Sequence, residues 1–571
     1  MKKDLFTIDQ TTLVLILAYS VLLFVPETML VGKLNWPVYL LTLVFNFAFY
    51  LSLSYPLCLV GRWGGRKFEK AWHVFWHVVV YLFSASNVFL YIFFGLCWDA
   101  FTIALINETN QSEVSGFAAT YFTDGKFYWI VLFYAVLGII EVIFLKRSNR
   151  QSVGMGKWRW LLIPIFLLMW CHCIVFSTDY DWNYDMAKGT PIKRNILWKL
   201  EQSVLVFAEN QKDYDTCALH QKDISIDSCS FRSPTIVVIV GESYIKQHSS
   251  LYGYAKETTP RLSEEKNLMV FNDVIAPFNL TSECFKYFLS VASVDDKCKW
   301  CEVPLFPALF RMAGYRVTFY SNQFVRGTHQ ERFDAKSGFI YHPAIEPSII
   351  DERNREKFSH DGELVELFKR NHSQVESVPY NLIFFHLYGQ HVKSKDRYPA
   401  TFNHFRAADY ADRTDLTEEQ RQEVAEYDNA TRYNDHVVSK IIDEFRDKDA
   451  IVLYFADHGD EANDYRPKLG RSFDFDKMSA KGIHCQFDIP FMIYVSDLYK
   501  QHHADIIQAI EASAKRRFMT DDLPHLMMFL AGIECQWYKP QRNLLSPDYQ
   551  GQRQRLISAE KIDYDKFCST H

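Results

Sequence analysis

The chain has 571 residues, of which 49% are hydrophobic and 16% aromatic, and its net charge at neutral pH is -6. This length exceeds that of one ordinary domain. The negative charge and the lack of a long basic run in the sequence exclude a typical nucleic-acid-binding protein. Apolar residues are concentrated in the first third, so the composition predicts a membrane protein with a large soluble part.

Five apolar stretches in the first third are long enough to span a bilayer. They are Thr12–Val31, Val38–Val60, Phe75–Cys97, Phe127–Leu145 and Trp160–Phe176. A single stretch of this kind is also compatible with a buried core helix, but five in succession with almost no internal charge favour membrane spans. The first has no small-residue cleavage site and is followed by further spans, so we do not expect a cleaved signal peptide.

The charges between these stretches predict their orientation. Lysine and arginine gather before the first stretch, between the second and third, and between the fourth and fifth. The loop after the third stretch is mainly acidic, with Asp99, Glu108 and Asp124. Because positive loops stay in the cytoplasm, five crossings place everything after Phe176 on the far side, which in a bacterium is the periplasm.

Cysteine positions suit an exported domain. Eight of the 12 cysteines follow the fifth stretch, and the closest pairs are Cys217 with Cys229 and Cys298 with Cys301. A CxxC spacing can also mark redox activity or half of a zinc site. The sequence has no second CxxC, so a structural disulfide is favoured, with the pairing left open.

Residues 177–231 are predicted to connect the membrane part to the soluble part. Within them, Asn195–Asn210 places its apolar residues on roughly one face of a helix. Two interpretations remain open. The helix could pack on the soluble domain, or it could lie in the membrane interface and hold that domain near lipid.

From residue 232 onward, short apolar runs alternate with amphipathic stretches. This pattern predicts an α/β domain around a mostly parallel sheet. The runs are Ile236–Val240, Val317–Tyr320, Leu382–Phe385, Ile451–Phe455 and Phe491–Val495.

Polar residues with metal-binding chemistry follow two of these runs. Glu242 comes after the first run, and Asp457 with His458 comes after the fourth. Because ligands bind at the carboxyl ends of strands in α/β sheets, residues distant in sequence could meet at one edge. Two carboxylates and an imidazole suit a catalytic zinc with one open position. Taken singly, Glu242 could be a solvated turn carboxylate and Asp457 a helix cap.

Thr281 is a candidate nucleophile for such a site. It opens the helix-like segment Thr281-Ser282-Glu283-Cys284-Phe285. A metal beside its hydroxyl would lower the hydroxyl pKa, and free N–H groups at a helix start favour a phosphate. We therefore expect Thr281 to attack a phosphodiester and to carry the phosphoryl group covalently. The simpler alternative is an N-cap threonine.

Three histidines are further candidates. His386 and His391 follow the third run, and His484 precedes the fifth. They could bind substrate phosphate, hold a second metal or protonate the leaving group. A single histidine is also common as an ordinary core or surface residue.

Several longer motifs occur in a fixed order around these residues. They are Gly-Glu-Ser (241–243), Ser-Leu-Tyr-Gly-Tyr-Ala-Lys-Glu-Thr-Thr-Pro (250–260), Thr281, His-Leu-Tyr-Gly-Gln-His (386–391), Arg-Tyr-Pro (397–399), Tyr-Asp-Asn-Ala-Thr-Arg-Tyr-Asn-Asp-His (427–436) and Asp-His-Gly-Asp-Glu (457–461). In this order the motifs resemble the phosphoethanolamine transferases of Gram-negative bacteria. The resemblance covers most of the chain and is closest to the branch that modifies the core heptose of lipopolysaccharide.

The resemblance implies a five-helix transmembrane bundle over residues 1–176, the connector 177–231, and a periplasmic α/β domain over 232–571. That domain would have a mostly parallel sheet like those of alkaline phosphatase and the sulfatases. The family resemblance also implies a monomeric, multi-pass protein of the inner membrane.

The resemblance implies one tightly bound zinc ion, with a second one compatible. Its ligands would be Glu242, Thr281, Asp457 and His458. His391 and His484 would serve catalysis and, with His386, substrate binding. Phosphatidylethanolamine would donate phosphoethanolamine to Thr281 and release diacylglycerol, and the acceptor would be lipopolysaccharide, at the core heptose or lipid A.

Two segments depart from the family pattern and leave the acceptor open. They are the threonine segment Asn279–Cys284 and the stretch between Asp464 and Gly482. Three other functions remain as alternatives. Water as the acceptor would make a phosphodiesterase or sulfatase-like hydrolase, a different group would make a phosphoglycerol-type transferase, and loss of chemistry would leave a lipid-binding pseudoenzyme.

Overall fold

The structure is a computed structural model of the chain. It describes residues 9–30, 36–61, 65–94, 97–98, 102, 121–148, 164, 212–323, 339–375, 378–472, 475 and 478–570. The contacts divide the chain into two units, Met1–Glu209 and Asn210–His571, so the division falls within the predicted connector. The predicted helix Asn195–Asn210 and, except for residue 164, the predicted span Trp160–Phe176 lie outside the described residues.

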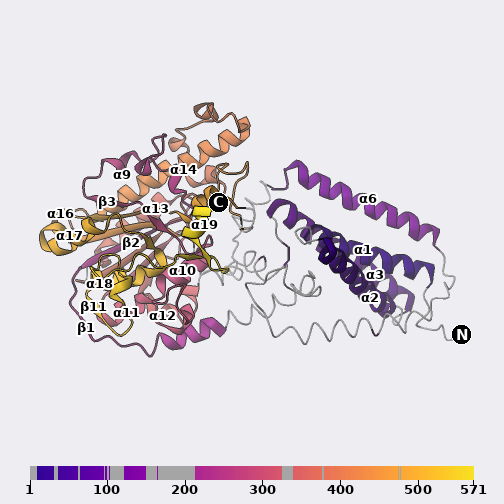
Figure 1. The fold of residues 1–571 in the computed structure, drawn as a ribbon, viewed down its shortest axis with the longest axis horizontal. Coiled ribbons are helices and arrows are strands. Elements are labelled where there is room, and N and C mark those ends of the chain that lie inside the picture. The colour runs from indigo at the N-terminus through magenta and orange to yellow at the C-terminus, as the bar shows by residue number, and fades with distance from the viewer. Residues whose placement is uncertain are drawn as a thin grey trace. The chain divides into compact units, whose positions relative to one another are not determined.

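The N-terminal unit contains long apolar helices (Figure 1). They are α1 (Gln10–Leu30), α2 (Trp36–Val60), α3 (Gly65–Phe94) and α6 (Gly125–Arg147), at the positions of the first four predicted spans. In the described part, α3 and α6 are long and apolar enough to cross a membrane, whereas the apolar parts of α1 and α2 are shorter. The predicted number of five spans is therefore not confirmed.

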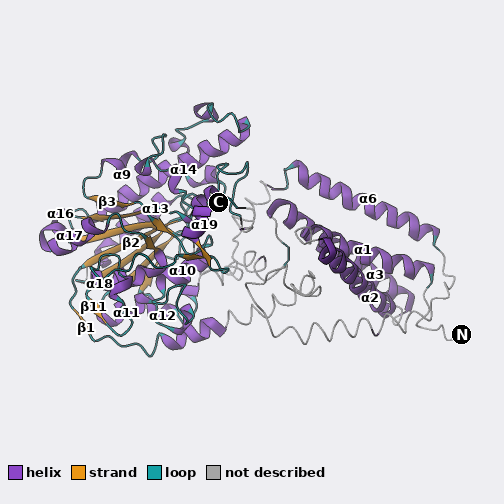
Figure 2. Ribbon diagram, viewed as in Figure 1, coloured by secondary structure: helices purple, strands orange, loops and turns teal. Residues whose placement is uncertain are grey.

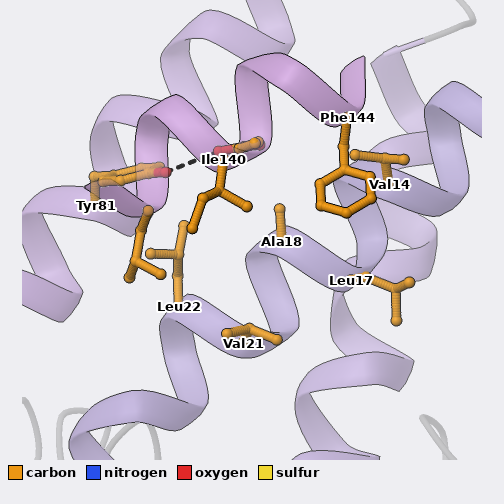
Figure 3. Close-up of a pocket in the computed structure, with 10 residues that line it drawn as sticks. Val14, Leu17, Ala18, Val21, Leu22, Tyr81, Ile140 and Phe144 are labelled. Atoms are coloured by element: carbon orange, nitrogen blue, oxygen red, sulfur yellow. Dashed lines mark hydrogen bonds between the residues drawn. The ribbon is translucent and has the colours of Figure 1, made fainter. Parts of the chain in front are cut away.

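A partly buried polar network joins α3 and α6. Glu141 on α6 pairs with His77 Nε2 on α3 at 2.5 Å and accepts a hydrogen bond from Tyr81 at 2.8 Å. Figure 3 shows the Tyr81 bond beside a cavity of about 250 Å³ whose walls are apolar side chains such as Ala18 and Ile140. Ionisable side chains among apolar helices persist when they pair with one another, as these do.

The C-terminal unit is built on a central sheet, drawn in orange in Figure 2. Its seven strands lie in the order β3-β9-β8-β2-β7-β5-β6. The strands are β2 (Thr235–Gly241), β3 (Leu268–Phe271), β5 (Arg316–Ser321), β6 (Glu352–Arg353), β7 (Asn381–His386), β8 (Ala450–Ala456) and β9 (Phe491–Val495). Residues of β2, β7 and β8 are almost all buried. Burial on both faces explains why their sequences are continuously apolar and do not alternate.

The sheet is mixed, which corrects the mostly parallel prediction in part. Strands β8, β2, β7, β5 and β6 run parallel, β9 is antiparallel to β8, and β3 is antiparallel to β9. The connection from β8 to β9 returns through α15 (Ala480–Phe487) to the edge where β8 ends. A parallel β9 would have required a crossover to the opposite edge.

Helices cover both faces of this sheet (Figure 1). One layer contains α9 (Pro260–Glu264), α13 (Asp361–Val375) and α14 (Glu418–Phe445), and the other contains α10 (Thr281–Leu289), α11 (Phe306–Ala313), α12 (Glu346–Ile349) and α18 (Leu523–Ala531). The outlying helices are α16 (Asp497–His502), α17 (Ala504–Ser513) and α19 (Tyr564–Thr570). Three two-stranded sheets pair β1 (Ser228–Cys229) with β11 (Ile533–Glu534), β4 (Val274–Ile275) with β10 (Phe518–Met519), and β12 (Leu556–Ile557) with β13 (Ile562–Asp563).

The predicted disulfide is wrong for the described cysteines, because all ten of them have free thiols. Cys217 is buried and its sulfur accepts from Gln221 Nε2 at 3.6 Å, whereas the Cys229 thiol donates to the Ala531 carbonyl at 3.6 Å. The two sulfurs of this pair are thus held by different neighbours. Cys298 and Cys301 also have free thiols; Cys301 lies within a short 3-10 helix (Trp300–Glu302), and Cys298 precedes it.

Candidate metal centre

The candidate site lies at the carboxyl edge of the central strands. Gly241 at the end of β2 pairs with Ala456 at the end of β8, so Glu242 and Asp457 leave adjacent strands at the same level. The amide of Asp457 donates to the Gly241 carbonyl at 2.9 Å and extends this pairing by one residue. The strand register therefore brings together residues that are more than two hundred positions apart in the sequence.

Four predicted residues meet at this edge. Glu242, Asp457 and His458 are at most 1% exposed, and one ligand atom from each lies within 4.8 Å of the others. The Thr281 hydroxyl is 2.9 Å from Glu242 Oε2 and 3.2 Å from His458 Nε2. Glu242 is thus no solvated turn carboxylate. Thr281 is no N-cap either, because it is the first residue of α10 and Leu280 is the cap.

The hydrogen-bond partners indicate which atoms of this cluster carry hydrogens, and they leave several lone pairs directed at one another. His458 Nδ1 lies 2.6 Å from the Gly459 carbonyl, which can only accept, so Nδ1 carries the hydrogen and Nε2 a lone pair. Thr281 donates its single hydrogen to Glu242, so its oxygen also turns a lone pair toward Nε2. Asp457 Oδ2 is buried without a hydrogen-bond partner among the described residues. A cation would satisfy these groups together, and this donor set fits zinc.

Burial and mutual charge set the protonation of the cluster. Burial lowers the pKa of His458 to about 3, and Arg471 acts in the same direction, so the imidazole is neutral and available as a ligand. Burial raises the pKa of Asp457, as does the adjacent carboxylate of Glu242. Burial alone would also raise the pKa of Glu242, but the nearby guanidinium of Arg471 and the hydrogen bond from Ser243 lower it below its ordinary value.

The Gly-Glu-Ser turn holds the two carboxylates in place. Ser243 donates from its hydroxyl to Glu242 Oε1 at 2.6 Å and from its amide to Asp457 Oδ1 at 3.1 Å. Its φ of 56° lies in the left-handed region, which costs a non-glycine residue about 1–2 kcal/mol. Tyr427 on α14 fixes the turn by donating to the Ser243 carbonyl at 2.6 Å. Such strain at a ligand turn is characteristic of functional sites.

The predicted histidines occupy three different environments. His386 is buried, 4.6 Å from the Phe285 ring, and its Nδ1 is 3.2 Å from Ser321 Oγ. His391 stacks on Tyr388, and its Nδ1 has no hydrogen-bond partner among the described residues. The backbone amide of its neighbour Gln390 donates to the Glu242 carbonyl at 3.1 Å, so the segment that carries His391 lies beside the cluster.

His484 stands apart from the four. Its Nδ1 is 3.2 Å from Asp488 and 2.9 Å from the Tyr564 hydroxyl, and its side chain is 40% exposed. The bond to Asp488 raises the pKa of His484 to about 10. In the part of the chain that the structure describes, no contact joins His484 to the metal-ligand candidates.

Sequence reasoning missed two neighbours of the cluster. Gln323 donates to Glu242 Oε2 at 2.9 Å and to the Leu387 carbonyl at 2.7 Å. Arg471 places Nη1 2.6 Å from His458 Nε2. Gln323 follows the carboxyl end of β5, so the same strand-end rule could have found it. Arg471 lies well beyond the end of β8 and in none of the motifs, so only the departure of the stretch between Asp464 and Gly482 from the family pattern pointed to its segment.

An α/β domain with acidic, imidazole and hydroxyl groups converging at the carboxyl edge of its sheet defines the alkaline-phosphatase-like class of proteins. Residues 234–533 match the Sulfatase family, and the chain belongs to this family.

Named relatives and solved structures agree with that placement. The phosphoethanolamine transferase EptC of Escherichia coli strain RS218 is 25% identical over 521 residues, which cover 86% of this chain and 85% of that protein. The periplasmic domain of E. coli EptC in complex with Zn is 27% identical, with a TM-score of 0.50 over 60% of this chain and 95% of that one. The integral membrane transferase EptA of Neisseria meningitidis is 16% identical, with a TM-score of 0.61 over 94% and 97%, and it shows a shared fold.

Proposed function

We propose that the chain is a zinc-dependent phosphoethanolamine transferase of the bacterial inner membrane. It would move phosphoethanolamine from phosphatidylethanolamine to lipopolysaccharide, at the core heptose or lipid A. The relatives named above are phosphoethanolamine transferases, and the neisserial one is named for lipooligosaccharide. The observation that carries the proposal is the Thr281 hydroxyl at the start of α10, within hydrogen-bond distance of both Glu242 and His458.

The ligand set supports zinc at this position. Glu242, Asp457 and His458 would hold the ion with Thr281 as the fourth ligand, and the E. coli EptC domain was solved with Zn. When bound, zinc would lower the pKa of the Thr281 hydroxyl and strengthen it as a nucleophile. Neutral His458 and its fixed Nδ1 hydrogen suit the ligand role. We propose one tightly bound ion.

The transfer proceeds in two displacements at phosphorus. In the first, Thr281 Oγ loses its proton and attacks the phosphodiester phosphorus, the bond to the glycerol oxygen breaks, and diacylglycerol leaves after gaining that proton. In the second, an acceptor oxygen loses its proton and attacks the phosphothreonine, and Thr281 Oγ leaves and regains a proton. We assign the proton transfers to His391, because the adjacent Gln390 amide donates to the Glu242 carbonyl. His484, charged and partly exposed, is assigned to binding of the anionic acceptor, and His386 to packing behind the ligands.

The proposed location follows from the predicted charges and the apolar helices. The predicted bundle, residues 1–176, would span the inner membrane, the connector 177–231 would follow, and the domain 232–571 would lie in the periplasm. The helices α3 and α6 support a membrane anchor. A lipid donor explains why such a site would be tethered, and we propose that the enzyme works as a monomer.

The test uses the purified full chain in nanodiscs that contain phosphatidylethanolamine. We expect intact-mass analysis to detect a phosphoethanolamine adduct on the protein, with an equal amount of diacylglycerol released. Thr281→Ala should abolish both, whereas Thr401→Ala, which removes an exposed threonine, should abolish neither. Added lipopolysaccharide should accept phosphoethanolamine from the protein adduct. Free phosphoethanolamine without modified lipopolysaccharide would identify a hydrolase, and no adduct on the zinc-loaded chain would refute the transferase.

A further inference from the structure

Arg471 is a cation at the metal-ligand cluster that pairs with no carboxylate in the described part of the chain. Its Nη1 donates to His458 Nε2 at 2.6 Å and to the Asn279 carbonyl at 3.0 Å. Its Nε and Nη2 make no hydrogen bond to any described residue. A guanidinium has five N–H donors in a rigid plane, so most of its donors remain available here.

The backbone beside Arg471 is firmly held. Asn279 Nδ2 donates to the Ser472 carbonyl at 3.0 Å and to Gln486 Oε1 at 2.9 Å. The Ser472 amide donates to the same Gln486 oxygen at 3.1 Å, and all three residues are buried. This clamp ties the Arg471 segment both to α15 and to the loop that leads into Thr281. Arg471 is thus built into the site and is no surface side chain that happens to reach it.

The bond between Arg471 and His458 excludes a metal on the same atom. Nε2 has one lone pair, which can accept the Arg471 hydrogen or bind a cation, but not both. A cation there would free the Nη1 hydrogen while the bond to Asn279, two residues before Thr281, keeps the guanidinium near the nucleophile. A planar guanidinium with free donors recognises the paired oxygens of a phosphate.

We propose that Arg471 binds the non-bridging oxygens of the phosphodiester that Thr281 attacks, and that it occupies His458 Nε2 until a metal displaces it. The ligand class is therefore an anionic phosphoryl group. Arg471 forms and breaks no covalent bond, but its charge stabilises the phosphorus centre while negative charge accumulates on the oxygens. This inference rests on the proposed function for the identity of the substrate, but not for its binding chemistry.

The first experiment measures zinc affinity of the full chain by competition with a chromogenic chelator. Because the metal must displace the guanidinium and is repelled by it, Arg471→Gln should bind zinc more tightly, by about tenfold. Arg466→Gln is the matched control, since Arg466 lies on the same segment and donates to the Gly470 carbonyl. Its zinc affinity should equal that of the wild type. Equal or weaker zinc binding by Arg471→Gln would overturn the displacement.

The second experiment uses inorganic phosphate as the probe, with every variant saturated with zinc. Arg471→Gln should weaken phosphate binding by about tenfold or more, and Arg471→Lys should weaken it less. In nanodiscs, adduct formation should slow on the order of 10²-fold in Arg471→Gln, and free guanidinium should partly restore Arg471→Ala. Unchanged phosphate binding in Arg471→Gln would overturn the proposal. Absence of adduct in the wild type would instead refute the transferase, because phosphate binding does not depend on turnover.

Discussion

At the scale of single residues, each candidate ligand has its own support. Glu242 accepts from Ser243 on one oxygen and from Gln323 on the other. His458 is fixed in one tautomer by the Gly459 carbonyl, and Asp457 Oδ1 accepts from two backbone amides. Neighbours of this kind orient metal ligands and raise metal affinity. The cluster is therefore preorganised before an ion binds.

Gln323→Met tests this support directly. Methionine has a similar length but cannot donate to Glu242 Oε2, so the carboxylate loses its orientation. We expect the zinc dissociation constant of the full chain to rise about 10–100-fold. Chelator competition measures it, and Gln247→Met, at an exposed glutamine outside the cluster, is the control. An unchanged dissociation constant in Gln323→Met would show that Glu242 is held without this bond.

At the scale of elements, the site depends on a close approach between the loop after β8 and α15. The amide of Gly459 donates to the Gln486 carbonyl at 2.9 Å. A side-chain carbon at Gly459 would lie 2.0 Å from the backbone oxygen of Cys485. Only glycine allows this contact, and the same loop carries His458.

Gly459→Ala should therefore separate α15 from the loop. The clash is with backbone atoms and cannot be relieved by a rotamer change, so we expect the free energy of unfolding to fall by about 1–3 kcal/mol or more. Zinc binding should weaken as well, because His458 precedes the displaced residue. Denaturant unfolding followed by tryptophan fluorescence measures the first effect. Wild-type stability together with wild-type zinc affinity would contradict the close approach.

A buried group of charged and polar side chains around His248 links α14 to the loop after β2 and the loop after β8. Its Nδ1 is 2.5 Å from Asp428 on α14, and its Nε2 is 3.1 Å from Asp464 in the loop after β8. Tyr254 and Tyr410 also donate to Asp428. Burial lowers the pKa of His248, but Asp464 and Asp428 outweigh it and raise the pKa to about 10. The imidazolium therefore stays charged in the folded protein at neutral pH.

The raised pKa of His248 predicts a pH-dependent stability. Protonated His248 contributes to the free energy of unfolding, and this contribution is fully present below the unfolded-state pKa of about 6.5. It is lost as the pH rises toward 10, because over this range the folded state keeps a proton that the unfolded state has released. From this source the free energy of unfolding falls by at most about 1.4 kcal/mol per pH unit. Denaturant unfolding between pH 6.5 and 10 should show this decline in the wild type and in His404→Gln, whose histidine is exposed. A decline of the same size in His248→Gln would exclude the imidazolium as its source.

The sequence predicted the strand-end residues well because their signal is local. Glu242 and the Asp457-His458 pair each follow a continuously apolar run, and such runs mark buried strands whatever their partners. The reversal of β9 was not predictable from its own residues, because direction depends on how the preceding loop returns. Arg471 was missed for the same reason, since its side chain is held by the carbonyl of Asn279, which lies in a distant part of the chain. Cysteine spacing did not predict the state of the thiols, because cysteines that are close in sequence do not form disulfides among the described residues.

At the scale of the whole molecule, the two units have separate cores. The hydrophobic core of the C-terminal unit contains residues from Tyr214 to Tyr564, and a different cluster lies among α1, α2, α3 and α6. All four candidate metal ligands belong to the C-terminal unit. The candidate metal ligands and the long apolar helices therefore belong to different units of the chain.

This division predicts how a fragment of residues 210–571 should behave. It contains its own hydrophobic core, so we expect it to fold. Its zinc dissociation constant should lie within about twofold of that of the full chain. It should nevertheless form the Thr281 adduct far more slowly from phosphatidylethanolamine in vesicles, because it no longer shares a membrane with its donor and loses the high effective concentration of a tethered site. Chelator competition and intact-mass kinetics measure the two properties on the same preparation. Adduct formation at the rate of the full chain would contradict a role for the apolar helices in reaching the donor, and loss of zinc binding would contradict an independent catalytic unit.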